Sequence, residues 1–290
     1  QVSICATSAD WYGFAMAPSR ASHPTPLLII GGGRMGSALA EGWRAAGIAA
    51  SSIHIVEREA KARKTLKAAG FSVHAALPDL APALTLLAIK PQGFAEFAPS
   101  LGAWYRARKP HPLISILAGI PITRLEEALG PKSLVLRAMP NTPALVQAGA
   151  SALYANAVVS AEQRDIAGAI LQAVGLACWL DQEAQMDAVT ALSGSGPAYF
   201  FLLLEAMQVA GTELGLSAEV AKALALQTAF GAAKLALASD VDAAELRRRV
   251  TSPGGTTEAA IRQFESEHFR DIVARALGKA AARSAELASS

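Results

Sequence analysis

The sequence has little cysteine, little histidine and almost balanced charge. Two cysteines among 290 residues cannot form a disulfide framework, and their scarcity suggests a reducing compartment. The five histidines show no metal-ligand spacing, so we expect no bound metal. A net charge of +2 is too small to indicate a nucleic-acid partner. The apolar runs are interrupted short of a membrane span, so we expect no membrane partner. These absences favour a cytoplasmic protein that binds a small molecule.

The first 25 residues differ in composition from the rest of the chain. They contain several serines and prolines and show neither a helical nor a strand period. They also lack the basic region and the long apolar region of a secretory signal. We therefore expect residues 1–25 to form a poorly ordered tail.

Two patterns of apolar residues divide the remainder. Strands are expected at residues 27–30, 53–56, 84–89, 113–117, 135–138, 151–154 and 177–180, with helices at 37–46, 59–69 and 93–103 between the early ones. This alternation is typical of a mostly parallel, doubly wound sheet. Helices alone are expected afterwards, at 185–192, 198–215, 217–238, 243–250, 257–267 and 269–287. The sequence thus predicts an α/β fold, with a doubly wound sheet domain at 26–181 and an all-helical domain at 182–290.

The two long helices expected at 198–215 and 217–238 are apolar almost all the way round. Such helices need burial on every side, and a domain of this size has limited interior for two of them. Burial against a second copy of the same helices is the simplest solution. We therefore expect a homodimer.

A glycine motif follows the first expected strand. In the stretch LLIIGGGRMG at 27–36, Gly31, Gly33 and Gly36 match the G-x-G-x-x-G pattern between a strand and a helix. Glycines at these positions allow a tight turn and let backbone N–H groups approach a pyrophosphate. An acidic residue, Glu57, follows at the spacing expected for a ribose contact. The pattern predicts dinucleotide binding; the alternative is a glycine-rich turn that binds nothing.

Two later strands end in unusual segments. Lys90 lies in AIKPQ at 88–92, and ligands of open α/β sheets bind outside the carboxyl ends of strands. The segment MPNTP at 139–143 is stiffened by two prolines, and Asn141 presents a hydrogen-bonding side chain on it, which suits a flat ring such as nicotinamide. The alternatives are a solvated lysine and a turn that caps its own backbone.

The expected helical domain contains two glycine-rich breaks, SGSGP at 193–197 and TSPGGTT at 251–257. Backbone N–H groups of Gly254 and Gly255, with the hydroxyls of Thr256 and Thr257, would form a cradle for a carboxylate at the start of a helix. The alternative interpretation is ordinary helix capping.

Several catalytic patterns are missing from the sequence. SGSGP does not match the G-x-S-x-G nucleophile elbow, and no glycine loop ends in Gly-Lys-Ser/Thr. None of the five segments described above contains a histidine. An enzyme of this kind, without an evident strong acid or base, suits a substrate that is already activated, such as a protonated imine.

Taken together, these segments resemble pyrroline-5-carboxylate reductase, a family of proline biosynthesis. The matching stretches, in the family's order, are IIGGGRMG at 29–36, AIKPQ at 88–92, RAMPNTPALVQAGASALYAN at 137–156, MDAVTALSGSGPAYFF at 186–201 and RRRVTSPGGTTEAAI at 247–261. The resemblance covers the chain from about residue 27 to its end, and the last two motifs are highly specific.

The resemblance implies a Rossmann-type N-terminal domain, an all-helical C-terminal dimerisation domain, and reduction of (S)-1-pyrroline-5-carboxylate to L-proline with NADPH or NADH. The implied cofactor contacts are Gly31, Gly32, Gly33, Arg34, Met35, Gly36, Glu57, Arg58, Ala88, Ile89, Lys90, Pro91, Met139, Pro140 and Asn141. The implied substrate contacts, contributed by the partner subunit, are Val250, Ser252, Gly254, Gly255, Thr256 and Thr257. Thr257 is expected nearest the imine nitrogen, as the catalytic residue, and assembly of the dimers into a higher oligomer is left open by the sequence.

Residues near Glu57 leave the cofactor choice open. An acidic side chain there normally accepts a hydrogen bond from the ribose 2′-OH and repels a 2′-phosphate. However, Arg58 follows directly, and Lys61 and Arg63 are close enough in sequence to bind that phosphate. Since the family favours NADPH, we expect NADPH, with NADH also accepted.

Two other interpretations compete with this one. The first is a related reductase acting on another imine or on a β-hydroxy acid, which would use a lysine such as Lys222 or Lys234 on a helix. Neither lysine lies beside a glycine-rich loop. The second is a non-catalytic dinucleotide-binding sensor, which leaves the TSPGGTT turn without a role.

Overall fold

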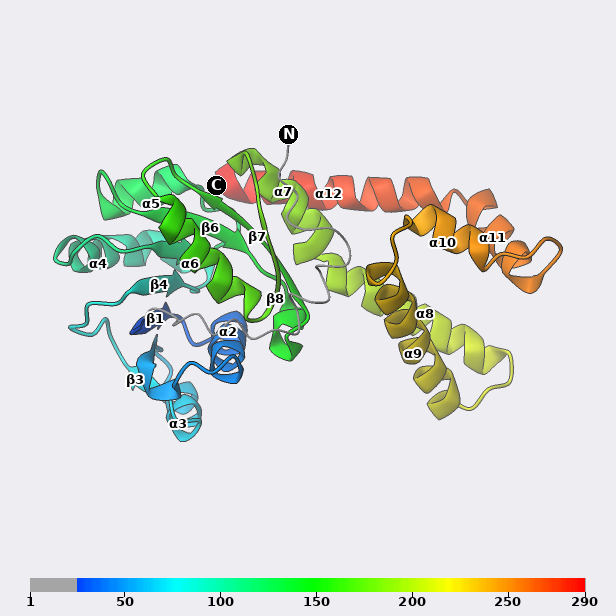
Figure 1. Ribbon diagram of the computed structural model, residues 1–290, viewed down its shortest axis with the longest axis horizontal. Helices are drawn as coiled ribbons and strands as arrows, with labels where there is room; N and C mark the ends of the chain where they lie inside the picture. Colours follow the sequence, from blue (N-terminus) through cyan, green and yellow to red (C-terminus); the bar gives the residue numbers. More distant parts are fainter. Residues whose placement is uncertain (1–24, 290) are drawn as a thin grey trace. The chain divides into compact units, whose positions relative to one another are not determined.

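The computed structural model describes residues 25–289, which form two compact units (Figure 1). The α/β unit contains residues 25–194 together with 281–289, and the helical unit contains residues 195–280. The tail expected at residues 1–25 lies outside the described residues, apart from Thr25.

The α/β unit is built on one sheet of eight strands in the order β3-β2-β1-β4-β5-β6-β7-β8. Neighbouring strands are parallel except β6 and β7, which are antiparallel. The strands are β1 (Leu27–Ile30), β2 (Ile53–Val56), β3 (Ser72–His74), β4 (Leu84–Leu87), β5 (Leu113–Ser115), β6 (Val135–Met139), β7 (Gly149–Ala155) and β8 (Gly175–Trp179). The doubly wound fold class is confirmed, and β3 is a strand that the sequence pattern missed.

Helices cover both faces of this sheet, because its central strands are apolar on both sides. In β1, Leu27 and Ile29 pack into one core with α2, α3 and α6, whereas Leu28 and Ile30 pack into a second core with α4 and α5. The helices of the α/β unit are α2 (Arg34–Ala45), α3 (Ala60–Ala68), α4 (Phe94–Arg106), α5 (Ile122–Leu129), α6 (Ala161–Gln172) and α7 (Met186–Val189). Short 3-10 turns are η1 (Ala50–Ser52), η2 (Pro91–Gly93), η3 (Thr142–Val146) and η4 (Glu183–Gln185), and η5 (Thr190–Gly194) is a π-helical turn.

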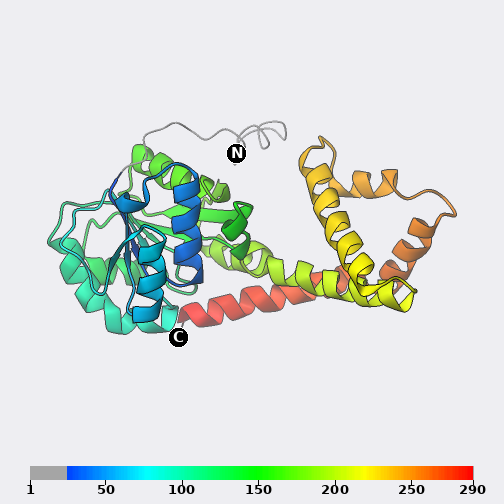
Figure 2. The ribbon, with the colours of Figure 1, turned by 90° about the horizontal axis from the view of Figure 1, so that it is seen from below.

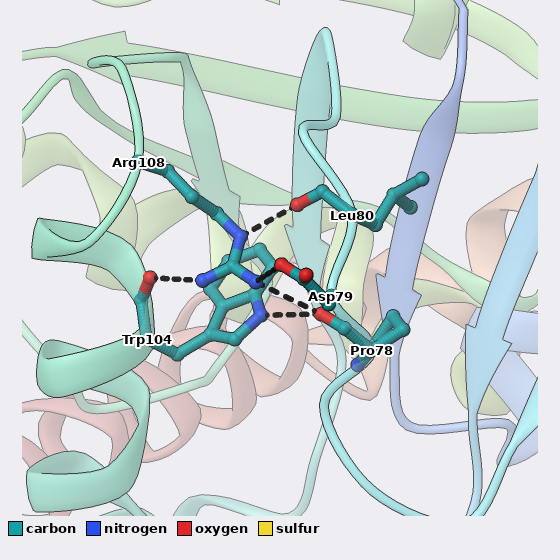
Figure 3. Close-up of polar contacts among 5 residues, drawn as sticks. All are labelled: Pro78, Asp79, Leu80, Trp104 and Arg108. Atoms are coloured by element: carbon teal, nitrogen blue, oxygen red, sulfur yellow. Dashed lines mark hydrogen bonds and ion pairs between the residues drawn. The ribbon is translucent and has the colours of Figure 1, made fainter.

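The long loop between β3 and β4 is held by Arg108, just after α4 (Figure 3). Its guanidinium donates to the carbonyl oxygens of Leu80 at 2.5 Å, Trp104 at 2.6 Å and Pro78 at 3.1 Å. It also lies 4.2 Å from the centroid of the Trp104 ring, whose Nε1 donates to the Pro78 oxygen at 2.8 Å. Asp79 completes the contacts through an ion pair of 3.1 Å with a fully exposed carboxylate. One side chain thus fixes the chain segment that leads into β4.

The helical unit contains α8 (Gly196–Glu213), α9 (Ala218–Leu237), α10 (Ala243–Arg249), α11 (Thr256–Ser266) and the first part of α12 (Phe269–Ser289). Helices α8 and α9 meet through small residues: a Cβ added at Gly211 would lie 3.3 Å from the Cβ of Ala221. Large apolar side chains elsewhere on the two helices stay exposed, including Phe200 (67%), Phe201 (63%) and Phe230 (61%). One copy of the chain therefore leaves uncovered the apolar helix faces that the sequence predicts to be buried.

One expectation about apolar runs needs correction. Helix α9 is long and apolar enough to cross a membrane by length and composition alone, so it does not fall short of a span as expected. An apolar helix that packs against another protein surface passes the same test. Its charged residues, Glu219, Lys222 and Lys234, are distributed from its first turn to its last.

The last turns of α12 belong to the α/β unit. Helix α12 is drawn as one continuous helix (red in Figure 2). Its Ser284 is 6% exposed and donates from Oγ to the Asp187 carboxylate of α7 at 2.6 Å. Near its end, the carbonyl oxygen of Leu287 would lie 2.9 Å from a Cβ added at Gly119, which has a φ of +74°. The C-terminal end of the chain is therefore packed against the loop that follows β5.

We predict that Arg108→Lys lowers the free energy of unfolding by about 1–3 kcal/mol, because an ammonium group cannot replace the planar fork that serves several carbonyl oxygens. Urea unfolding followed by circular dichroism measures this loss. Asp79→Asn is the matched control, and its effect should stay below about 1 kcal/mol because the ion pair is exposed. Equal losses in the two variants would mean that the ion pair, and not the carbonyl contacts, holds the loop.

Candidate functional site

Four of the sequence-predicted segments lie at one edge of the sheet. Ile30 at the end of β1 is in register with Val56 at the end of β2 and with Leu87 at the end of β4. Strands β5 and β6 continue the sheet in the same direction, so the segment from Met139 ends at this edge as well. In open α/β sheets this carboxyl edge is where ligands bind. The fold thus brings together residues 31–36, 57–58, 88–91 and 139–141.

The three motif glycines differ in what a side chain would meet. Gly31 has a φ of +110°, and a Cβ added there would lie 2.5 Å from the carbonyl oxygen of Ala88. A Cβ added at Gly36 would lie 2.0 Å from the carbonyl oxygen of Gly31. A Cβ added at Gly33 would meet no other atom of residues 25–289 within 4 Å. Protein packing therefore explains two of the glycines, and the open side of Gly33 fits the approach of a pyrophosphate.

The N-terminus of α2 has the features of an anion-binding site. Gly33 is its N-cap, the part of the chain that the structure describes provides no side-chain cap for it, and its first turn contains no acidic residue. The free N–H groups and the positive end of the helix dipole favour a negatively charged group at this place. The exposed Arg34 and the half-buried Met35 begin the same helix. The residues present therefore fit the pyrophosphate of a dinucleotide.

The segment after β4 runs directly beside the glycine loop. The N–H of Ala88 donates to the carbonyl oxygen of Ile30 at 2.8 Å, which continues the β1–β4 pairing up to the loop. Ile89 is half-buried, and Lys90 is exposed as the N-cap of η2, whose first residue is Pro91. The segment is therefore held next to the glycine loop by a backbone hydrogen bond rather than by a polar side chain.

The side chain of Asn141, which was predicted to face a ligand, forms its hydrogen bonds within the protein. Its side chain is 8% exposed; its amide nitrogen donates to the carbonyl oxygen of Ser193 at 3.0 Å, and its amide oxygen accepts from the N–H of Ala150 at 2.8 Å. Met139 is buried next to it and lies 3.6 Å from a Cβ added at Gly194. Asn141 therefore joins the segment after β6 to the π-helical turn η5. Such turns occur often at functional sites.

Sequence reasoning missed the loop after β5. Strand β5 lies between β4 and β6, so the loop at 116–119 lies between two of the predicted segments. The N–H of Ile116 donates to the carbonyl oxygen of Leu87 at 3.0 Å, and Gly119 has the positive φ described above. A glycine shortly after an apolar strand is the signal that identifies this loop.

The carboxylate of Glu57 is held by two backbone donors. Oε2 accepts from the N–H of Gly32 at 3.0 Å, and Oε1 accepts from the N–H of Glu59 at 2.8 Å. Arg63 donates from Nη1 to the carbonyl oxygens of Glu57 at 3.0 Å and of Arg58 at 2.5 Å. Arg58 and Lys61 extend into solvent. Three basic residues were predicted to be able to bind a 2′-phosphate. One of them, Arg63, is instead bonded to backbone oxygens.

A pair of histidines lies on β2 and on the neighbouring edge strand β3. His54 Nδ1 is 3.0 Å from His74 Nε2, and the two rings are nearly parallel. Burial lowers the pKa of both histidines; the partner ring adds to the effect at His54, and Lys67 adds to it at His74. Among residues 25–289, no group of three or more metal-ligating side chains is placed to hold a metal ion.

In the helical unit, the turn at 251–257 precedes α11. Gly254 has a φ of +71°, and its N–H donates to the Glu258 carboxylate at 2.8 Å, while the N–H of Gly255 donates to the carbonyl oxygen of Ser252 at 3.0 Å. The hydrogen bond from Gly254 lowers the pKa of Glu258, and the nearby Arg262 lowers it further. The two glycine donors predicted for a carboxylate are therefore already bonded.

The other predicted residues of this turn stand in solvent. Thr256 and Thr257 form the first turn of α11, whose N-cap, Gly255, has no side-chain hydrogen bond. Because the first N–H groups of a helix have no partner within it, those of Thr256 and Thr257 are the available donors. Ser252 is exposed, and Val250 is 62% exposed. An anion bound here would meet helix N–H groups and two threonine hydroxyls.

Comparison with known proteins gives matches along almost the whole described chain. A family model for pyrroline-5-carboxylate reductase dimerisation matches residues 183–287, and one for NADP oxidoreductase, coenzyme F420-dependent, matches residues 26–119. A pyrroline-5-carboxylate reductase from Pseudomonas aeruginosa is 52% identical over 268 residues, which are 90% of this chain and 96% of the relative. A pyrroline-5-carboxylate reductase from Pasteurella multocida is 38% identical over 90% of this chain and 97% of the relative.

Solved structures are similar over the same range. The structure of a pyrroline-5-carboxylate reductase from Coxiella burnetii has a TM-score of 0.85 and 37% identity, and covers 91% of this chain and 98% of that one. The Plasmodium falciparum pyrroline carboxylate reductase with NADP bound has a TM-score of 0.82 and 29% identity, and covers 92% of this chain and 99% of that one. The similarity therefore includes both the α/β unit and the helical unit.

We predict that Gly33→Val weakens dinucleotide binding by at least about tenfold, because a side chain would occupy the space where the backbone meets the pyrophosphate. The backbone there has a φ of −68° and a ψ of −170°, which valine adopts without strain, so the melting temperature should stay within about 2 °C. Calorimetric titration and thermal unfolding measure the two effects. Gly36→Ala is the contrasting variant and should lower the melting temperature. Unchanged affinity in Gly33→Val would place the pyrophosphate elsewhere.

Proposed function

The chain belongs to the pyrroline-5-carboxylate reductase family, and we propose that it reduces (S)-1-pyrroline-5-carboxylate to L-proline with NADPH or NADH. This makes it an oxidoreductase of proline biosynthesis that acts on a C=N bond. The observation that carries the proposal is the similarity to these reductases across both units, since it includes the glycine loop and the TSPGGTT turn together.

Reduced nicotinamide supplies the hydride when it is bound. The part of the protein is to place the cofactor along the carboxyl edge of the sheet. The N–H groups at the start of α2 bind the pyrophosphate, and the backbone of residues 88–91 lines the path of the sugar. The segment at 139–141, which is fastened by the two hydrogen bonds of Asn141, lies beside the ring. Because these contacts are mainly backbone contacts, they hold the ring in one orientation with little motion.

The imino acid is bound by the turn before α11, contributed by a second copy of the chain. The N–H groups of Thr256 and Thr257 receive its carboxylate, with Ser252, Gly254 and Gly255 around it. Val250 packs its exposed side chain on the apolar ring. The Thr257 hydroxyl forms a hydrogen bond at the ring nitrogen and so orients the imine carbon toward the hydride donor. The imine is bound in its protonated form, so its nitrogen keeps that proton when the hydride reaches the imine carbon, and no further acid or base is needed.

The assembly follows from the exposed apolar helices. We propose a homodimer formed through α8 and α9, with dimers assembling into a larger oligomer, in the cytoplasm. Residues 26–181 are the cofactor domain and residues 182–290 the dimerisation and substrate domain. This functional division differs from the compact units, because packing attaches residues 182–194 and 281–289 to the sheet. Light scattering of the purified protein measures the mass of the assembly.

An assay of purified protein tests the activity directly. Absorbance of the reduced nicotinamide should fall when pyrroline-5-carboxylate is added, with either NADPH or NADH, and L-proline should accumulate in equal amount. Absence of turnover with both cofactors, in protein that binds a dinucleotide, would contradict the proposed reaction.

We predict that Thr257→Ala lowers kcat/KM for pyrroline-5-carboxylate by at least about tenfold, the cost of one hydrogen bond to a charged group. The side chain is exposed in the first turn of α11, so the melting temperature should not change. Thr257→Ser keeps the hydroxyl and should stay within about threefold of the parent. Dinucleotide affinity should be equal in all three proteins. If Thr257→Ala retained full kcat/KM, Thr257 would have no place in the site.

A further inference from the structure

The structure assigns a cofactor preference to Glu57: we propose that this side chain makes the enzyme favour NADH over NADPH. The inference rests on the proposed function, and it reverses the expectation of NADPH drawn from the family resemblance. It concerns the side chain that ends β2, next to the strand from which the glycine loop starts.

The carboxylate of Glu57 is fixed in place by contacts on both of its oxygens. One oxygen binds the N–H of Gly32 in the glycine loop, and the other binds the N–H of Glu59 at the start of α3. A Cβ added at Gly32 would lie 3.1 Å from Oε2 of Glu57 and 2.8 Å from Cδ1 of Leu66. The carboxylate is thus packed against the loop and is joined to two separate segments. Turning it away would leave two backbone donors without their protein acceptor.

This position is where the adenosine ribose of a dinucleotide lies in folds of this kind. A fixed carboxylate with free lone pairs accepts hydrogen bonds from the ribose hydroxyls of NADH. The 2′-phosphate of NADPH would bring a second anion to the same place, and the repulsion between like charges in contact weakens binding. Glu57 could move away from the 2′-phosphate only by breaking both hydrogen bonds, so the repulsion between the two anions persists.

The basic residues nearby are poorly placed to compensate. Arg63 is half-buried and donates to the carbonyl oxygens of Glu57 and Arg58, so its guanidinium is bonded to the backbone of the same turn. Arg58 and Lys61 are exposed, where solvent and salt screen their charges. The charged group that contacts the glycine loop is therefore the Glu57 carboxylate, whereas Arg63 is bonded to the backbone and the other two cations are exposed.

Binding of two nucleotide fragments tests the preference without relying on catalysis. ADP-ribose and 2′-phospho-ADP-ribose differ only in the phosphate at issue. Calorimetric titration of the full-length protein should give at least about tenfold tighter binding of ADP-ribose. Steady-state kcat/KM should favour NADH over NADPH in the same direction.

Two variants assign the effect to Glu57. In Glu57→Ser the ratio of the two affinities should shift toward 2′-phospho-ADP-ribose by at least about tenfold, because the repelling charge is gone. Glu57→Gln keeps an oxygen acceptor for Gly32 and should shift the ratio in the same direction if the serine variant does not fold. Glu59→Gln is the matched control, since it removes an exposed charge two positions away and keeps the backbone N–H; its ratio should stay within about twofold.

Three results would overturn the inference. The first is parent protein that binds 2′-phospho-ADP-ribose as tightly as ADP-ribose or more tightly. The second is a shift in Glu59→Gln as large as that in Glu57→Ser, which would reduce the effect to general surface charge. In both cases the dinucleotide site and the proposed function would stand. The third is that neither fragment binds, and then the proposed function would be wrong together with the preference.

Discussion

The contact between Gly31 and the end of β4 is the constraint on which the candidate site depends. The two backbones approach so closely that a single methyl group at Gly31 would overlap the carbonyl group of Ala88. The same glycine has a positive φ, which turns the chain from β1 into α2. Gly36 then packs α2 onto that turn. The direction of the helix, and with it the direction of its free N–H groups, follows from these two contacts.

Much of the fold could be predicted from the sequence because its information is local. Short apolar runs rich in leucine, isoleucine and valine identify the buried parallel strands, and glycines identify their ends. Strand β3 was not predicted because it has three residues, of which only Val73 is apolar. The loop after β5 escaped for a different reason: its place between two predicted segments follows from the order of strands in the sheet.

The site was less predictable because its polar groups are bonded to partners that the motifs themselves do not identify. Asn141 has the composition of a ligand-binding tip, but it is bonded to Ser193 and Ala150. The N–H of Gly254 was expected to be free and is bonded to Glu258. Buried and half-buried polar groups are nearly always paired, and pairing partners cannot be identified from spacing alone. What spacing did identify is the set of backbone positions, because glycine requirements follow from local geometry.

The attachment of the last turns of α12 to the α/β unit has a consequence for how the protein is made. The α/β unit is discontinuous: residues 25–194 are synthesised before the helical unit, and residues 281–289 are synthesised after it. Until residues 281–289 have been synthesised, Ser284 cannot bind Asp187, and the end of α12 cannot cover the loop at Gly119. Nascent chains must therefore hold an incomplete sheet domain while the entire helical unit is translated. The α/β unit is therefore completed only after the helical unit has been translated.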